Sequence, residues 1–346
     1  MLKIGTLFSG FGGVDIGAQA AGIEHAWGLE YDADIAGVAE TNGFSATVAN
    51  ILEVDPRDFA VVNVLHASPP CPSFSTAKVG RKETENDVAM ARAVAGFIEE
   101  LQPKVFTLEN VYGYRKAQGF AAILAALDSL GYMYSYAHIN AADFGVPQTR
   151  RRLWLRAVRG ALVPTLPPAE KWVGWYEAIE DLIPGLPGSQ FAPWQERQMP
   201  KWCKSLMKTG AASFLGYNGN AVAVEENTPS FTVTANQNQA TQIRGFIVDD
   251  QNNGSPNSDG ERGLTIRDDG NPMFTVSATQ TKRSVRAWLS QGRVVAMTPR
   301  CLARFQSFPD WYVLPERNVL ACKGIGNAVP PLLYQKLIAQ FVGYVL

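Results

Sequence analysis

The sequence predicts an α/β protein with a mostly parallel central sheet, followed by a smaller, β-rich part. Three observations support this. Short apolar runs alternate with amphipathic stretches over residues 2–159, as strands joined by crossover helices do. Near Val163 Pro and Trp become frequent, and beyond Ala211 the chain is rich in Gly, Asn, Gln, Thr and short β-prone runs. Residues 330–346 have the apolar spacing of a helix that packs on the core.

The individual elements follow from this alternation. The apolar runs predict strands at residues 2–8, 25–30, 62–67, 104–110, 132–139 and 151–158. The amphipathic stretches predict helices at residues 13–21, 32–41, 87–101 and 120–130. In such a sheet, ligands bind at the carboxyl ends of the strands. Two similar runs, PSFTVTA from Pro229 and PMFTVSA from Pro272, predict a pair of related strands in the later part.

Composition and charge limit the classes of protein to which this chain can belong. The sequence shows no basic-then-apolar leader and no apolar run of about 18 residues, so we expect a cytoplasmic protein. Cys71, Cys203, Cys301 and Cys322 have no CxxC or His-containing spacing, which predicts reduced thiols and no metal site. The formal net charge is −1, yet residues 282–304 contain six basic side chains and no acidic one. Such a stripe suits nucleic-acid phosphates, with an ordinary solvated surface as the alternative.

The segment ASPPCPSFSTA, residues 67–77, sets three prolines around Cys71. Proline fixes φ and donates no backbone hydrogen bond, so this segment is a stiff loop, neither helix nor central strand. It follows a predicted strand, which places the thiol at the ligand-binding edge of the sheet. A free cysteine is most often a small buried hydrophobe. The alternative here is a thiol presented for reaction.

A second motif, FSGFGG at residues 8–13, follows the first predicted strand and opens the first predicted helix. Glycines at such a turn let a ligand approach the backbone and the N–H groups of the helix start, although a tight packing turn has the same pattern. The motif is not GxGxxG, which disfavours a dinucleotide site. The second predicted strand ends in Glu30, whose carboxylate can accept hydrogen bonds from both ribose hydroxyls. Together the two features predict a cofactor that contains a nucleoside.

Charged side chains gather at the next strand ends. Glu109 ends the strand after the cysteine loop, so we expect it to share a pocket with Cys71 as a potential proton donor beside a nucleophile. In PQTRRR, Arg150 and Arg152 are two residues apart in a predicted strand and therefore point to the same side.

The ordered set FSGFGG, Glu30, PPC, ENV, QTRRR, TPRCLARFQSFPD and GNAVPP resembles the DNA cytosine-5 methyltransferases across nearly the whole chain. The resemblance implies a Rossmann-like, S-adenosylmethionine-dependent methyltransferase sheet with an inserted smaller, β-rich target-recognition domain. It implies a cofactor-binding catalytic domain from residues 1–165 and 318–346. Residues 166–317 would form the target-recognition domain and hinge.

The resemblance also implies a reaction and its residues. A methyl group passes from S-adenosylmethionine to carbon 5 of a cytosine flipped out of a specific duplex sequence, with a covalent adduct to Cys71. Glu109 matches the acid that contacts the pyrimidine, and Arg150 and Arg152 match the arginines that hold the target. The implied cofactor-binding residues are Phe8, Ser9, Gly10, Phe11, Gly12, Gly13, Glu30, Tyr31, Asn50, Ile51, Pro70, Asn327, Ala328 and Val329. The expected DNA-binding residues are Ser75, Gln148, Lys282, Arg283 and Arg286.

Three positions depart from the family pattern. Pro72 stands where the family usually has Gln after the cysteine, which removes a side-chain amide and a backbone donor. Asn50 replaces an Asp that bonds the adenine amine, and its amide oxygen can still accept that bond. Cys301 replaces the usual Glu after TPR, and we infer no role for it.

Two alternatives use the same scaffold: an RNA cytosine-5 methyltransferase, or a catalytically silent DNA-binding homologue. Duplex DNA is favoured because residues 163–300 form a large segment, basic toward its end and rich in side chains that read base edges. All implied catalytic groups come from one chain, which predicts a monomer. A cognate restriction endonuclease, as in restriction-modification systems, is a further candidate partner.

Overall fold

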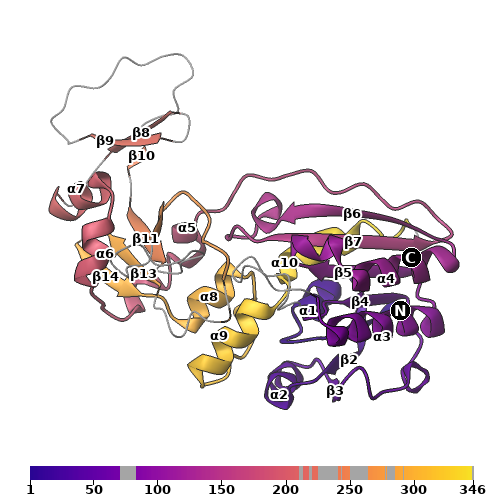
Figure 1. Cartoon of the computed structure of the whole chain (residues 1–346). Coiled ribbons are helices and arrows are strands. Elements are labelled where there is room, and N and C mark those ends of the chain that lie inside the picture. Colours follow the sequence, from indigo (N-terminus) through magenta and orange to yellow (C-terminus); the bar gives the residue numbers. More distant parts are fainter. Residues whose placement is uncertain are drawn as a thin grey trace.

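A seven-stranded sheet forms the larger part of the molecule (Figure 1), in the order β3-β2-β1-β4-β5-β7-β6. The structure is a computed structural model, and it describes residues 1–70, 83–209, 213–217, 220–224, 241–242, 244–249, 264–276, 278, 285–290 and 292–344. The strands are β1 (Lys3–Leu7), β2 (Glu24–Glu30), β3 (Ala46–Val48), β4 (Val64–Ala67), β5 (Val105–Asn110), β6 (Tyr132–Asn140) and β7 (Arg151–Arg159). Strands β1 to β5 pair in parallel, and β7 runs antiparallel to β5 and β6. The predicted α/β class is confirmed. The short strand β3, whose residues are mostly exposed, was not predicted.

Helices cover both faces of this sheet. They are α1 (Gly13–Ala20), α2 (Ala33–Thr41), α3 (Glu85–Leu101), α4 (Gln118–Ser129) and α10 (Pro331–Ala339), with 3-10 turns η1 (Pro56–Asp58), η2 (Tyr112–Lys116) and η3 (Ala141–Phe144). Successive strand residues alternate between the faces, so Leu65 joins the core under α3 and α4 while Val64 joins the core under α1 and α10. Helix α3 starts two residues earlier than predicted because Thr84 and Asp87 form a capping box.

The C-terminal helix returns to the start of the chain, as predicted. Leu333 and Leu337 of its apolar face, with Phe341 just beyond its end, share one core cluster with Val14 and Ala18 of α1. Glycines make this close approach possible: a Cβ on Gly13 would lie 2.2 Å from the carbonyl oxygen of Val329, and one on Gly17 would lie 2.4 Å from that of Pro331. The N-terminal and C-terminal segments of the described chain therefore pack against each other.

His25 links three of these early segments and makes stability depend on pH. Its Nδ1 lies 2.9 Å from Asp15 Oδ1, and its Nε2 lies 2.9 Å from the carbonyl oxygen of Ser45. Burial lowers the pKa of His25, but the hydrogen bond and charge of Asp15 and the Ser45 carbonyl outweigh it, so the pKa is raised above its usual 6.5. Both partners favour the protonated ring.

A pKa raised on folding gives stability that is fully present below the unfolded value and is lost as pH rises through the folded value. We therefore expect the unfolding midpoint in urea to fall between pH 6 and pH 8.5, and to fall less in His25→Gln. The quantity to compare is the slope of the unfolding midpoint against pH. The midpoint itself also changes in His25→Gln, because the substitution leaves Asp15 without this partner. Equal slopes for the two proteins would contradict the assignment.

The second part of the chain contains two antiparallel sheets, ordered β12-β11-β13-β14 and β10-β8-β9. Its elements are α5 (Trp175–Ile179), η4 (Ile183–Gly185), α6 (Pro193–Gln198), α7 (Lys201–Thr209), β8 (Ser213–Tyr217), β9 (Asn220–Val224), β10 (Thr241–Gln242), β11 (Gly245–Asp249), β12 (Thr265–Asp268), β13 (Arg286–Leu289) and β14 (Arg293–Ala296). Phe191, Phe246 and Trp288 stack in sequence at its core, with ring centroids 6.1 and 5.6 Å apart. The expected β-rich character holds beyond residue 212 among the described residues. Residues 175–209 instead contain the short helices α5, α6 and α7 and the 3-10 turn η4, with non-helical segments between them.

Helices α8 (Pro299–Phe305) and α9 (Asn318–Asn327) lie between the two parts (Figure 1). Arg304 of α8 ties this helix to the segment after α5 through Asp181 Oδ2 at 2.8 Å, and to the segment after α8 through Asp310 Oδ2 at 2.7 Å. Among its described residues, the run from Pro272, predicted as a strand, contributes an isolated bridge between Met273 and Gln148 and no longer strand. Its partner run from Pro229 lies outside the described residues.

The domain limits at residues 165 and 318 stay a prediction. Over the described ranges, every helix is too short or too polar to span a membrane.

Candidate active site

A pocket of about 910 Å³ opens at the carboxyl ends of the parallel strands. The ends of β1, β2, β3, β4 and β5 supply its lining, together with the start of β7, one face of α3 and the residues of α9. This is the edge at which the sequence predicted a ligand. Glu30 lies in one region of the pocket wall, and Glu109 with two arginines lies in another.

The turn after β1 is built around the Glu30 carboxylate. Gly10 N donates to Glu30 Oε2 at 2.9 Å, and Asp32 N donates to Glu30 Oε1 at 3.0 Å. Each oxygen keeps a second lone pair for a ligand. Phe8 adopts a left-handed backbone with φ of 59°, a conformation that costs a non-glycine residue about 1–2 kcal/mol. Ser68 Oγ, from the end of β4, donates to the Phe8 carbonyl at 3.3 Å and helps hold this turn.

The neighbouring wall combines an exposed aromatic ring with amide and charged groups. Both Tyr31, which is 75% exposed, and Ile51, which is buried, line this wall. Asn50 Oδ1 accepts from Leu52 N at 3.1 Å and retains one lone pair, so the bond expected from it is still available. Asp32 caps α2 and pairs with Lys323 Nζ of α9 at 2.6 Å. The Lys323 hydrogen bond, with backbone N–H groups of α2, holds the pKa of Asp32 below its usual range although burial opposes them.

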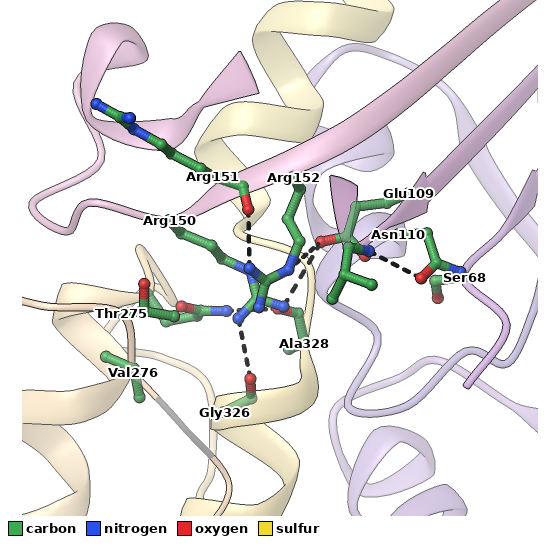
Figure 2. A network of polar contacts seen from close by, with 12 residues as sticks. Ser68, Glu109, Asn110, Arg150, Arg151, Arg152, Thr275, Val276, Gly326 and Ala328 are labelled. Atoms are coloured by element: carbon green, nitrogen blue, oxygen red, sulfur yellow. Dashed lines mark hydrogen bonds and ion pairs between the residues drawn. The ribbon is translucent and has the colours of Figure 1, made fainter. Parts of the chain in front are cut away.

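Glu109 forms the polar centre of the other region (Figure 2). Its Oε1 lies 3.3 Å from Arg152 Nε and 3.6 Å from Arg150 Nη2. These are ion-pair distances without hydrogen-bond geometry, and Oε1 makes no hydrogen bond to any described residue. The side chain is 8% exposed. This buried carboxylate oxygen lies beside two cations and has unused hydrogen-bonding capacity. It can therefore accept a hydrogen bond from a ligand or carry a proton to it.

Arg150 is fixed from two sides. Its Nη1 donates to the carbonyl oxygen of Gly326 in α9 at 3.0 Å, and its side chain is 4% exposed. Burial, followed by the charge of Arg152, lowers the pKa of Arg150 to about 9, although Glu109 acts in the opposite direction. The guanidinium therefore stays charged at neutral pH. The predicted orientation of Arg150 and Arg152 toward the same side is confirmed.

Asn110 connects this centre to the cysteine loop. Its Nδ2 donates to the carbonyl oxygen of Pro69 at 3.1 Å, and its Oδ1 accepts from Val111 N at 2.8 Å. The side chain is buried. The last residues before Cys71 are thus held by the strand that carries Glu109, while Cys71 itself lies outside the described residues.

A model of the C-5 cytosine-specific DNA methylase family matches residues 2–343. The chain belongs to this family. Type II methyltransferase M.AplI of Arthrospira platensis is 29% identical over 338 residues, covering 97% of this chain and 84% of that protein. Type II methyltransferase M.DdeI of Desulfomicrobium norvegicum is 25% identical over 378 residues, covering 99% and 89%. A solved structure of a Spodoptera frugiperda DNMT2 mutant, 16% identical, has a TM-score of 0.58 over 99% of this chain and 100% of that one, which shows a shared fold.

Membership makes the chain a DNA cytosine-5 methyltransferase that uses S-adenosylmethionine, so the predicted family, enzyme class and cofactor are confirmed. The region of the methyltransferase pocket around Glu30 fits this cofactor. The carboxylate presents free lone pairs to ribose hydroxyls, the Phe8 ring supplies an apolar surface, and Asn50 offers an amide oxygen.

The structure brings eight of the expected cofactor residues to the pocket wall. They are Phe8, Gly10, Glu30, Tyr31, Asn50, Ile51, Pro70 and Asn327. The remaining six are not among these lining residues, and their contact with the cofactor stays a prediction. They are Ser9, Phe11, Gly12, Gly13, Ala328 and Val329. The Phe11 ring is fully buried, 6.2 Å from the ring of Tyr312, and Gly13 packs on the Val329 carbonyl. These residues hold the walls of the methyltransferase pocket.

Two residues that were expected to contact DNA, Gln148 and Arg286, make hydrogen bonds within the protein. Gln148 is completely buried, and its Oε1 accepts from Val276 N at 2.7 Å while its Nε2 donates to the Phe305 carbonyl at 3.2 Å. Its amide is therefore used to join the two parts, and the prediction that it contacts DNA is wrong. Arg286 Nε donates to Ser189 Oγ at 3.0 Å inside the second part. Ser75, Lys282 and Arg283 lie outside the described residues.

Sequence reasoning missed five polar residues of the pocket: Asp32, Ser68, Asn86, Asn110 and Lys323. Asn110 had a local signal, because a polar residue ending an apolar strand next to Glu109 is placed at the ligand edge. Asp32 and Lys323 had none, since their ion pair joins residues 291 positions apart.

Cys203, Cys301 and Cys322 are buried free thiols. Burial raises the pKa of each, which keeps these sulfurs protonated and unreactive. This agrees with the prediction of reduced core cysteines and leaves Cys301 without a part in the chemistry.

Proposed function

We propose that this methyltransferase modifies carbon 5 of a cytosine flipped out of a specific duplex sequence, with Cys71 as the nucleophile. The observation that carries the proposal is the Glu109 carboxylate, buried between Arg150 and Arg152 with an oxygen free of hydrogen bonds. That group lies in the same pocket as the residues that fit the cofactor. Asn110 ties the cysteine loop to it through Pro69.

The chemistry explains these residue types. Carbon 5 of cytosine is a weak nucleophile, so the Cys71 thiolate adds to carbon 6 and gives the ring enamine character. Glu109 bonds N3 and the exocyclic amine, which favours this addition when a proton lies between carboxyl and N3. Arg152 lies where it can bond the carbonyl of the base as well as Glu109. S-adenosylmethionine, when bound, would supply an electrophilic methyl group to carbon 5, and its sulfur would keep the electron pair of the broken bond and leave as a neutral thioether. Loss of the carbon 5 proton and of the thiol then releases the methylated base and free Cys71.

Carbon 6 is not accessible inside a base stack, so the target base has to leave the duplex, at a cost of a few kcal/mol. The proposal assigns residues 1–165 and 318–346 to catalysis and residues 166–317 to target recognition. All proposed catalytic groups belong to one chain, so we propose a monomer acting in the cytoplasm. The names of the Type II relatives support a cognate restriction endonuclease as a partner in the cell.

The test is bisulfite sequencing of a mixed-sequence duplex after incubation with S-adenosylmethionine and protein. We expect protected cytosines in one short sequence context with the wild type. Cys71→Ser is expected to lower the rate by about 10⁴-fold or more, the scale on which loss of a nucleophile acts. Cys301→Ser is the matched control, because it changes a buried thiol outside the pocket whose Sγ lies 3.4 Å from Thr298 Oγ1.

Protection that persists with Cys71→Ser would contradict the role of Cys71. Absence of protection in DNA, together with methylated cytosine in an RNA pool treated in parallel, would transfer the activity to the RNA alternative.

A further inference from the structure

We propose that Glu83 is a positioning residue for methyl transfer, which holds the second end of the chain segment that carries Cys71; this rests on the proposed function. Glu83 is the first described residue after Cys71 in the sequence. It does not line the methyltransferase pocket. Its effect on the reaction therefore passes through the residues that it holds in place.

The Glu83 carboxylate lies at the start of α4. Its Oε2 accepts from Gln118 N at 2.8 Å, and its Oε1 accepts from Gly119 N at 2.9 Å. The first N–H groups of a helix have no partner within the helix, and Ala117 at the N-cap of α4 supplies no side-chain acceptor. A carboxylate is also favoured there by the partial positive charge of the helix start. Glu83 therefore caps α4 from a distant part of the sequence.

The packing around Gly119 shows that the carboxylate is closely fitted at this position. A Cβ on Gly119 would lie 2.7 Å from the Cβ of Ala91 in α3 and 3.2 Å from Glu83 Oε1. Glycine therefore lets the start of α4 approach both α3 and the carboxylate. The two residues after Glu83 on the other side are fixed as well, because Thr84 begins the capping box of α3 with Asp87. Glu83 is thus held between the starts of two helices.

The start of α4 belongs to the same stretch of chain as Glu109. Helix α4 follows β5 after the single 3-10 turn η2. Asn110, next to Glu109, holds the first end of the cysteine loop through the Pro69 carbonyl. Residues 109–119 therefore hold both ends of the segment that carries Cys71, the first through Asn110 and the second through Glu83.

Two fixed ends limit the positions that the residues between them can occupy. Cys71 directly follows the first held end, and Glu83 follows it by 12 residues. The proposed nucleophile and the proposed acid Glu109 are thus positioned by one frame. A misplacement of about 1 Å can cost a reaction about a hundredfold in rate. We therefore expect Glu83 to act on kcat and not on the affinity for the cofactor, whose fitting residues lie around Glu30.

The test compares Glu83→Gln with Gln118→Pro in single-turnover methylation of a duplex that bisulfite sequencing has identified as a substrate. Glutamine offers one side-chain oxygen and no charge, so it cannot serve both N–H groups. Proline is favoured at the first position of a helix and removes the N–H of residue 118. Ala117, with φ of −75° and ψ of 147°, already has the extended backbone that a residue before proline needs.

We expect each substitution to lower kcat by about tenfold to a hundredfold, with the KM for S-adenosylmethionine changed by less than about twofold. The double variant should lose less than the product of the two single losses, because both substitutions remove the same contact. A residue with a merely structural role would not give this division between kcat and KM. Urea unfolding midpoints show whether each variant is folded in the assay, and if one of the two is not, the other alone decides.

Gln118→Ala and Glu85→Gln are the matched controls. The first keeps the backbone N–H that Glu83 accepts. The second removes an exposed carboxylate in the first turn of α3 that makes no hydrogen bond with any described residue. Both should keep the wild-type kcat.

Three results would overturn the role of Glu83: wild-type rates in Glu83→Gln and Gln118→Pro, losses that multiply fully in the double variant, or a loss that appears only in KM. Failure of the wild type to methylate any duplex would overturn the proposed function instead, so the two failures are distinguishable.

Discussion

Glu109→Gln is expected to lower kcat for methylation of duplex DNA by about 10²–10⁴-fold, the usual contribution of a positioned acid or base. The substitution keeps the size of the side chain but removes the charge that Arg150 and Arg152 face at 3.6 and 3.3 Å. An amide cannot carry a proton to N3 of the base, and the two arginines lose their shared counter-charge. The measurement is a single-turnover methylation rate at saturating DNA and cofactor, with folding checked by circular dichroism.

Glu30→Gln provides the contrast for Glu109→Gln, because it changes a carboxylate elsewhere in the same pocket wall. Its expected effect is a KM for S-adenosylmethionine raised about tenfold, as for loss of a charged hydrogen bond, with a much smaller fall in kcat than in Glu109→Gln. If both substitutions changed kcat and KM in the same proportion, the division of the pocket into a cofactor region and a base region would be refuted.

Gly13→Ala is expected to destabilise the fold by about 1–3 kcal/mol, the range for overpacking a tight contact. The added Cβ would lie 2.2 Å from the Val329 carbonyl oxygen, which belongs to backbone and cannot rotate away. Either α1 or the segment that leads into α10 has to move. Because that segment also carries Asn327 to the pocket, cofactor affinity should fall together with the urea unfolding midpoint.

Gly37→Ala is the control for this prediction. Gly37 is also helical, in α2, but a Cβ there would meet no atom within 4 Å. Replacing a helical glycine by alanine at an open position should raise stability by about 0.5–1 kcal/mol. Equal effects of the two substitutions would show that helix propensity, and not contact with Val329, determines the result.

The sequence allowed the main sheet and the centre of the site to be predicted because both depend on local periodicity. Strand ends at Glu30 and Glu109 follow from apolar runs that stop at an acid, and the common direction of Arg150 and Arg152 follows from strand geometry. The helices between residues 175 and 209 were not predicted because each is short, and the frequent Pro and Trp there indicated only a change of domain.

Residues that pack against distant parts of the chain, such as Gly13 and Gln148, could not be predicted, for a different physical reason. A glycine-rich turn has the same sequence whether it admits a ligand, as at Gly10, or a neighbouring backbone, as at Gly13. Likewise, QTRRR does not reveal that Gln148 faces Val276 and Phe305, because those partners are 128 and 157 residues away. Such contacts depend on tertiary packing and not on spacing along the chain.

The return of α9 and α10 to the first helix has a consequence for the timing of synthesis. Gly326 holds Arg150, Lys323 holds Asp32, and Leu333 and Phe341 complete the core beneath α1. A ribosome-bound chain that has produced only the sheet and the second part therefore lacks one wall of the reaction pocket and a face of its core. We therefore expect methyl transfer only after α9 and α10 have emerged and docked, so that a polypeptide without them leaves DNA unmodified.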